Sequence, residues 1–181
     1  MKKYIIIFSI MLLVILYMNL HNKDVSPIVK LFKEHLNEKI SLDGYSHVFS
    51  EDSISDYSVF RDKYPYLIIS YIDEDCSVCK FKLKEWYKYA DMLPKNEQLA
   101  YVFIYRGENL MNYLKSVLGK RGLHPFYYLY SEEFTYIANN PHIDRQIIDN
   151  SFLIDKENQI RVIGSPLTSS GVKELINKAI Q

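Results

Sequence analysis

The sequence is poor in cysteine, has no excess of either charge and has no paired histidines. It contains two cysteines, and its 22 Lys and Arg residues balance 22 Asp and Glu residues. A nucleic-acid-binding surface requires clustered basic charge, so nucleic acid is not expected as a partner. The five histidines stand singly, whereas zinc sites group their ligands at short spacings. A zinc site is therefore not expected either.

An apolar run, YIIIFSIMLLVILYMNL, follows two lysines at the N-terminus. As a helix its seventeen residues would reach roughly 25 Å, close to the thickness of a bilayer core. The run lacks a small-residue cleavage site and a following cysteine for lipid attachment. We therefore expect residues 1–23 to be an uncleaved signal anchor, with a cleaved signal peptide as the alternative. The preceding lysines place the N-terminus in the cytoplasm and the rest of the chain outside it, in an extracytoplasmic or periplasmic compartment.

Apolar runs and amphipathic stretches alternate in the remainder of the chain. Continuous apolar runs predict buried strands at 66–72, 98–105 and 125–130. Helical spacing and capping residues predict helices over 27–40, 76–93, 108–120 (stopped by Gly122), 131–140 (capped by Ser131) and 169–180. A hairpin is predicted from strands at 151–155 and 160–164.

This order of elements predicts an α/β fold with a central mixed sheet and helices on both faces. At 181 residues the chain suits one domain with a core better than two. We expect an anchor over 1–23, a linker with a short helix and possible edge strands over 24–59, and the α/β domain over 60–181.

Both cysteines lie in the segment DEDCSVCKFKLKEW, between a predicted buried strand and a predicted helix. Cys76 would begin the helix, where free N–H groups and the helix dipole favour a thiolate. Cys79 lies one turn on and continues the apolar stripe of Leu83 and Trp86. We therefore expect Cys76 to attack and Cys79 to resolve a mixed disulfide. A purely structural bond is the alternative, although closing so short a loop would stabilise the chain little.

A strand, then C-x-x-C opening a helix, then the late segment FLIDKENQIRVIGSP resembles the thioredoxin superfamily. More narrowly, the chain is similar to the membrane-anchored, extracytoplasmic thioredoxin-like proteins of bacteria, the TlpA/ResA type, over about residues 60–181. This resemblance implies reduction or exchange of protein disulfides through Cys76 and Cys79. It implies protein thiols and disulfides and a membrane redox donor as partners, with no cofactor and no metal.

The sequence departs from the family pattern at three positions. The usual cis-proline before the FLID strand falls near Asp149, the usual buried acid falls on Ser70, and the usual tryptophan falls on Asp75. A catalytically quiet thioredoxin-like binding module with a resting disulfide is therefore the alternative function. The chain is not expected to be a peroxiredoxin, because the P-x-x-x-T-x-x-C motif of that family is missing around Cys76. A copper chaperone is not expected either, because it would need C-x-x-x-C.

Three carboxylates, Asp73, Glu74 and Asp75, precede the first cysteine. Nearby negative charge raises the pKa of a thiol and opposes the help of the helix dipole. We therefore expect the pair to be a weak oxidant, nearer to thioredoxin at about −270 mV than to DsbA at about −120 mV. Neutralising the three carboxylates should make it more oxidising.

Overall fold

The computed structural model describes residues 26–50, 53–119, 125–131 and 133–181, and the predicted anchor at 1–23 lies outside them. Within these described ranges no helix is long and apolar enough to cross a membrane. The chain divides into two units, Met1–Glu34 and His35–Gln181. Helix α2 (Pro27–His35) begins where the helix over 27–40 is predicted to begin, and it ends five residues before the predicted end. The sheet and both cysteines belong to the second unit, and the predicted boundary at residue 60 stays a prediction.

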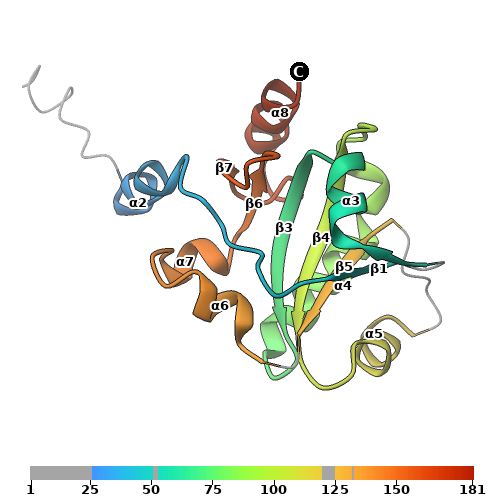
Figure 1. The fold of residues 1–181 in the computed structure, drawn as a ribbon. Helices are drawn as coiled ribbons and strands as arrows, with labels where there is room; N and C mark the ends of the chain where they lie inside the picture. The colour runs from blue at the N-terminus through green and yellow to red at the C-terminus, as the bar shows by residue number, and fades with distance from the viewer. Residues whose placement is uncertain (1–25, 51–52, 120–124, 132) are drawn as a thin grey trace, which may run out of the picture. The chain divides into compact units, whose positions relative to one another are not determined.

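One mixed sheet runs through the second unit in the strand order β2-β1-β5-β4-β3-β6-β7. Its strands are β1 (His47–Phe49), β2 (Ile54–Asp56), β3 (Tyr66–Asp73), β4 (Leu99–Arg106), β5 (Tyr127–Ser131), β6 (Ser151–Ile154) and β7 (Ile160–Ile163). The three central strands β5, β4 and β3 are parallel, and the pairs β1–β2 and β6–β7 add antiparallel edges. Figure 1 shows β3 and β4 side by side at the centre.

Helices cover both faces of this sheet, as predicted. They are α3 (Tyr57–Lys63), α4 (Ser77–Lys88), α5 (Leu110–Leu118), α6 (Thr135–Asn139), α7 (Arg145–Ile148) and α8 (Ser170–Ala179). On one face, α4, α5 and α8 enclose an aromatic core in which the Trp86 ring meets Phe103 edge-on at 5.9 Å. On the other face, α6 stacks Tyr136 on Tyr71 of β3, with ring centroids 5.8 Å apart.

The parallel register brings the ends of the central strands to one edge of the sheet. Asp73 at the end of β3 pairs with Arg106 at the end of β4, which in turn pairs with Ser131 at the end of β5. Helix α4 starts from this edge. Because side chains alternate along a strand, Ser70 lies on the same face as Ile68 and Ile72, the face that α4 covers.

Several helix boundaries differ from the predicted ones. Helix α4 ends at Lys88 and is followed by a short 3-10 turn, because Tyr89 leaves the helical conformation. Helix α5 ends at Leu118 and is followed by Gly119 as its C-cap residue, whose φ of +70° suits glycine, and the predicted stop at Gly122 lies outside the described residues. Ser131 is the last residue of β5 and caps no helix, because the next helix starts at Thr135.

Candidate functional site

Cys76 and Cys79 form a disulfide at the start of α4, with their Cα atoms 5.3 Å apart. Cys76 is the N-cap residue of this 12-residue helix. Its Sγ accepts a hydrogen bond from the backbone N–H of Cys79 at 3.1 Å. A reduced sulfur held there would face the free N–H groups and the positive end of the helix dipole. Both effects stabilise a thiolate at Cys76.

The two sulfurs differ in their surroundings. Cys79 packs against the aromatic core that contains Leu83 and Trp86, and both cysteines are half-buried. Val78, which lies between them, is 71% exposed. The assignment of Cys76 as the attacking and Cys79 as the resolving cysteine concerns reactivity and stays a prediction.

An arginine pairs with two of the three carboxylates that precede Cys76. Arg106 Nη1 lies 3.1 Å from Asp73 Oδ1 and 2.6 Å from Asp75 Oδ2. Asp73 is buried, and its Oδ1 also accepts a hydrogen bond from the N–H of Asp75 at 3.0 Å. Its carbonyl oxygen accepts one from the N–H of Cys76 at 3.1 Å. The ion pair and the turn that presents Cys76 therefore share one aspartate.

Sequence reasoning missed Arg106, although a signal for it was present. The predicted strands at 66–72 and 98–105 each end just before a charged residue, Asp73 and Arg106 respectively. Parallel neighbouring strands bring their carboxyl ends to one edge, so these two side chains could have been expected to meet there.

The third carboxylate, that of Glu74, is held by other groups. Its Oε2 accepts hydrogen bonds from Tyr105 Oη at 2.8 Å and from the N–H of Glu108 at 2.9 Å. Burial, and then this hydrogen bond to Glu74, raise the pKa of Tyr105 well above its usual value. A Cβ atom at Gly107 would overlap Glu74 Oε2 and Tyr105 Oη, so this hydrogen bond needs a glycine beside it. Despite the acidic run, no group of three or more His, Cys, Asp or Glu side chains is arranged for a metal ion within the described ranges.

A pair of serines occupies the place beneath α4 where the resemblance expects a buried acid. Ser70 Oγ lies 3.0 Å from Ser151 Oγ of β6, and both side chains are almost fully buried. One of the two hydroxyl groups donates a hydrogen bond to the other. A hydroxyl pair of this kind ionises far outside the neutral range, so it does not take the place of a carboxylate that exchanges protons.

The position expected for the cis-proline is held by Asp149, the C-cap residue of α7. Lys82 of α4 donates from Nζ to the carbonyl oxygen of Asp149 at 3.0 Å, and Arg145 pairs with its carboxylate at 3.0 Å. Burial lowers the pKa of Lys82 to about 8, and the Asp149 charge opposes part of this shift. The segment before β6 is thus tied to the helix that carries the cysteines.

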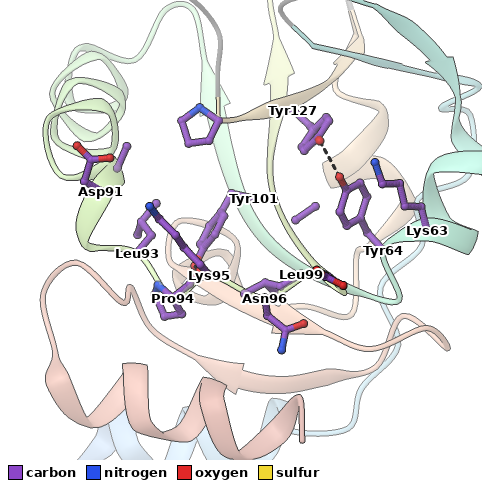
Figure 2. Close-up of a pocket in the computed structure, with 14 residues that line it drawn as sticks. Lys63, Tyr64, Asp91, Leu93, Pro94, Lys95, Asn96, Leu99, Tyr101 and Tyr127 are labelled. Carbon is purple, nitrogen blue, oxygen red and sulfur yellow. Dashed lines mark hydrogen bonds between the residues drawn. The ribbon is translucent and has the colours of Figure 1, made fainter.

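A large cavity lies at the other end of the sheet (Figure 2). Its volume is about 930 Å³, and its lining includes Leu99 and Tyr127, the first residues of β4 and β5, and Tyr64, which lies between α3 and β3. The hydroxyl groups of Tyr64 and Tyr127 meet at 2.9 Å, as Figure 2 shows. Because Cys76 follows the end of β3, neither cysteine lines this cavity. Disulfide exchange with a protein partner would take place at an exposed helix start and needs no such cavity.

Comparison with known proteins finds similarity in structure and none in sequence. No family model and no curated protein matches the chain. Among solved structures, a candidate thiol:disulfide interchange protein DsbE from Chlorobium tepidum is similar with a TM-score of 0.50 and 12% identity, over 80% of this chain and 99% of that one. A candidate electron transfer protein from Aquifex aeolicus VF5 is similar with a TM-score of 0.50 and 14% identity, over 78% of this chain and 94% of that one. A DsbF homologue from Corynebacterium diphtheriae has a TM-score of 0.48 and 13% identity, over 78% of this chain and 92% of that one.

At identities this low, the likeness concerns the fold. The first of these structures supports the predicted thioredoxin-like α/β fold, with a mixed sheet and helices on both faces. Within it, the disulfide has the C-x-x-C spacing and stands between a central strand and the helix that follows it.

Proposed function

We propose that the protein is a thiol–disulfide oxidoreductase that works through Cys76 and Cys79. The observation that carries the proposal is a disulfide at the junction of a central strand and a helix, with Cys76 as the N-cap residue. A sulfur in this position is stabilised as a thiolate when reduced, and a thiolate is the species that attacks disulfides. The fold supports this function without requiring it.

The reaction proceeds from the reduced pair in two exchanges. The Cys76 thiolate attacks one sulfur of a substrate disulfide, which forms a mixed disulfide and releases the other substrate sulfur as a thiolate. The Cys79 thiolate then attacks Cys76 Sγ, which closes the Cys76–Cys79 bond and releases the second substrate thiolate. Two electrons pass to the substrate, and the two protons lost by the cysteines go to its thiolates. A dithiol donor would reduce the pair again by the reverse steps.

The finer proposal is a membrane-anchored protein of the TlpA/ResA type with its thioredoxin-like domain outside the cytoplasm. The apolar run within residues 1–23 and the two lysines before it support this topology. The domain should be digested by protease added to cells whose outer layer is permeabilised, and the chain should stay in the membrane fraction at alkaline pH. Protection of the domain in intact spheroplasts would contradict the topology.

Exposed apolar side chains beside the disulfide favour a protein partner. Val78 and Phe81 are 71% and 69% exposed, and they lie three residues apart on the first turns of α4. Side chains at this spacing share one side of a helix. A partner could cover them while its own disulfide meets Cys76.

A catalytically quiet binding module is the second candidate. The Ser70–Ser151 hydroxyl pair in place of a buried acid favours it, and so does the Lys82 bond to the Asp149 carbonyl. Both features remove groups that family members use for proton transfer or for presenting backbone to a substrate.

Reduction of insulin disulfides by the full-length chain in detergent, with dithiothreitol as donor, separates the two candidates. An oxidoreductase should accelerate the reduction, and Cys76→Ser should abolish the acceleration. Cys79→Ser should instead accumulate mixed disulfides through Cys76, detectable on non-reducing gels. A wild-type rate equal to that of the Cys76→Ser/Cys79→Ser protein would favour the binding module.

A further inference from the structure

Arg106 lies where it can act on the cysteine pair without touching it. It is the last residue of β4 and stands in register with Asp73, the last residue of β3. Its Nη1 contacts both Asp73 and Asp75, and its side chain is 21% exposed. No other cation is paired with these two carboxylates in the part of the chain that the structure describes.

The guanidinium group is fixed from more than one side. Its central carbon lies 4.1 Å from the centre of the Phe134 ring, a cation–π contact. Its own backbone carbonyl accepts a hydrogen bond from the N–H of Glu74 at 2.9 Å. Backbone and side chain of Arg106 therefore both bind the turn between β3 and α4.

This turn leads directly to the attacking sulfur. Asp73 accepts one hydrogen bond from Asp75 and another from the N–H of Cys76. Loss of the Arg106 charge would leave the Asp73 and Asp75 carboxylates uncompensated within three residues of Cys76. Like charge destabilises a thiolate, and burial of Asp73 limits solvent screening.

The remaining charged groups around the helix start are already engaged or lie farther along the chain. Glu74 is bound by Tyr105 and Glu108, while Lys82 donates to the segment before β6. The turn carries Asp73, Glu74 and Asp75, and the neighbouring elements carry Arg106 of β4, Lys80 and Lys82 of α4, and Arg145 and Asp149 of the segment before β6.

We propose that Arg106 is a positioning residue for disulfide exchange: by pairing with Asp73 and Asp75 it shapes the turn that presents Cys76 and preserves the Cys76 thiolate beside an acidic segment. This inference rests on the proposed function of the pair. The alkylation of Cys76 is measured on the protein alone, without a substrate. A failure of the Arg106 inference can therefore be distinguished from a failure of the proposed function.

The test measures the alkylation of reduced full-length protein by iodoacetamide as a function of pH, with Cys79→Ala as the background so that Cys76 alone reacts. Arg106→Gln should move the midpoint of the profile up by about one pH unit. Arg106→Lys, which keeps the charge, should stay near the starting midpoint. Arg161→Gln is the matched control, because it breaks an Arg–Asp pair at the other end of the sheet and should move nothing.

A double variant separates charge from structure. Adding Asp75→Asn to Arg106→Gln should bring the midpoint back by about half a unit, because one uncompensated charge is gone. With both cysteines present, Arg106→Gln should also shift the equilibrium with glutathione about fivefold toward the protein disulfide at about pH 8. A folded Arg106→Gln protein with an unchanged midpoint would overturn the proposal.

If Arg106→Gln does not fold, the Arg106 charge can be tested in a protein that lacks the two carboxylates with which it pairs. In the Asp73→Asn/Asp75→Asn protein, adding Arg106→Gln removes a cation without leaving a buried anion. The midpoint should then rise by about one unit between these two proteins. Equal midpoints would show that Arg106 acts on the fold alone. A shifted midpoint in a protein that reduces no insulin would uphold Arg106 and count against the proposed function.

Discussion

Two aspartates at opposite ends of the sheet hold turns of the same kind. Asp73 ends β3, and Asp155 comes directly after the antiparallel strand β6. Each is buried, and each accepts a hydrogen bond at 3.0 Å from the N–H group two residues on. Each also pairs with an arginine, Asp73 with Arg106 at 3.1 Å and Asp155 with Arg161 at 2.5 Å.

The two turns differ in the groups that lie beyond the aspartate. Asp155 accepts a further hydrogen bond from the N–H of Gln159 and closes the β6–β7 hairpin, so all of its bonds hold the fold. At the other end the arginine is shared with a second carboxylate, Asp75, which is 81% exposed, and the next residue is Cys76. The same local device serves stability alone at one end, and at the other end it also sets the charge around a sulfur.

Replacing Asp155 by Ala should have the largest effect on stability. The change removes three hydrogen-bonded contacts and leaves Arg161 without a carboxylate partner, which costs about 2–3 kcal/mol of unfolding free energy. The pH profile of Cys76 alkylation should stay unchanged, because the hairpin lies at the other end of the sheet. Urea unfolding of the oxidised protein and the alkylation profile of the reduced protein measure the two quantities. A moved alkylation midpoint would break the comparison.

The free energy of unfolding should depend on pH through Lys82, which lies on the helix that carries the cysteines. The folded protein releases the Lys82 proton near pH 8, while the unfolded chain keeps it to about 10.5 because burial lowers the folded pKa. Just above pH 8 the unfolded state therefore binds more protons at Lys82, so stability should rise with pH by about 1 kcal/mol per pH unit. Urea unfolding of the oxidised protein from about pH 7.5 to about pH 8.5 tests this, because from about pH 9 the unfolded chain also loses tyrosine protons that the folded protein keeps, which lowers stability.

Lys82→Met should flatten that slope. The substitution keeps an unbranched side chain of similar length but has no proton to lose, so any remaining slope would come from other groups. Lys95→Met, at the exposed rim of the cavity at the other end, is the matched control and should keep the wild-type slope. An equal slope in wild type and Lys82→Met would show that the Lys82 ammonium is solvated.

The central strands and the cysteine junction could be predicted because their signals are local. A strand covered on both faces is a continuous apolar run, and β3 and β4 follow the predicted runs to within a residue. The hairpin of β6 and β7 was likewise evident from two short apolar runs around a polar turn. A cysteine at a strand–helix junction needs no long-range contact to be recognised.

The missed features depend on short elements or distant contacts. Helix α3 has seven residues and α7 has four, too few for a helical period to stand out. Arg106 was missed because it meets Asp73 only through the register of two strands. For the same reason the acidic run looked like one group of charges, whereas the structure gives Asp73, Glu74 and Asp75 three different sets of partners.

Asp75→Asn should have the smallest effect on stability and still change the chemistry of the pair. Its carboxylate is 81% exposed, and exposed ion pairs contribute about 0–1 kcal/mol, so unfolding should change by less than about 0.5 kcal/mol. Removing all three carboxylates would also break the hydrogen bonds of Asp73 and Glu74, which makes the single change the cleaner test. The Cys76 alkylation midpoint should fall by about half a pH unit at low salt, and the pair should become more oxidising.

In about 1 M salt most of this shift should vanish, because the Debye length falls to about 3 Å. Asp91→Asn, an exposed carboxylate at the cavity end, should leave the midpoint in place. A shift that persists in high salt would mean that the substitution moves the turn itself, and no shift at low salt would mean that Arg106 already cancels the Asp75 charge at the sulfur.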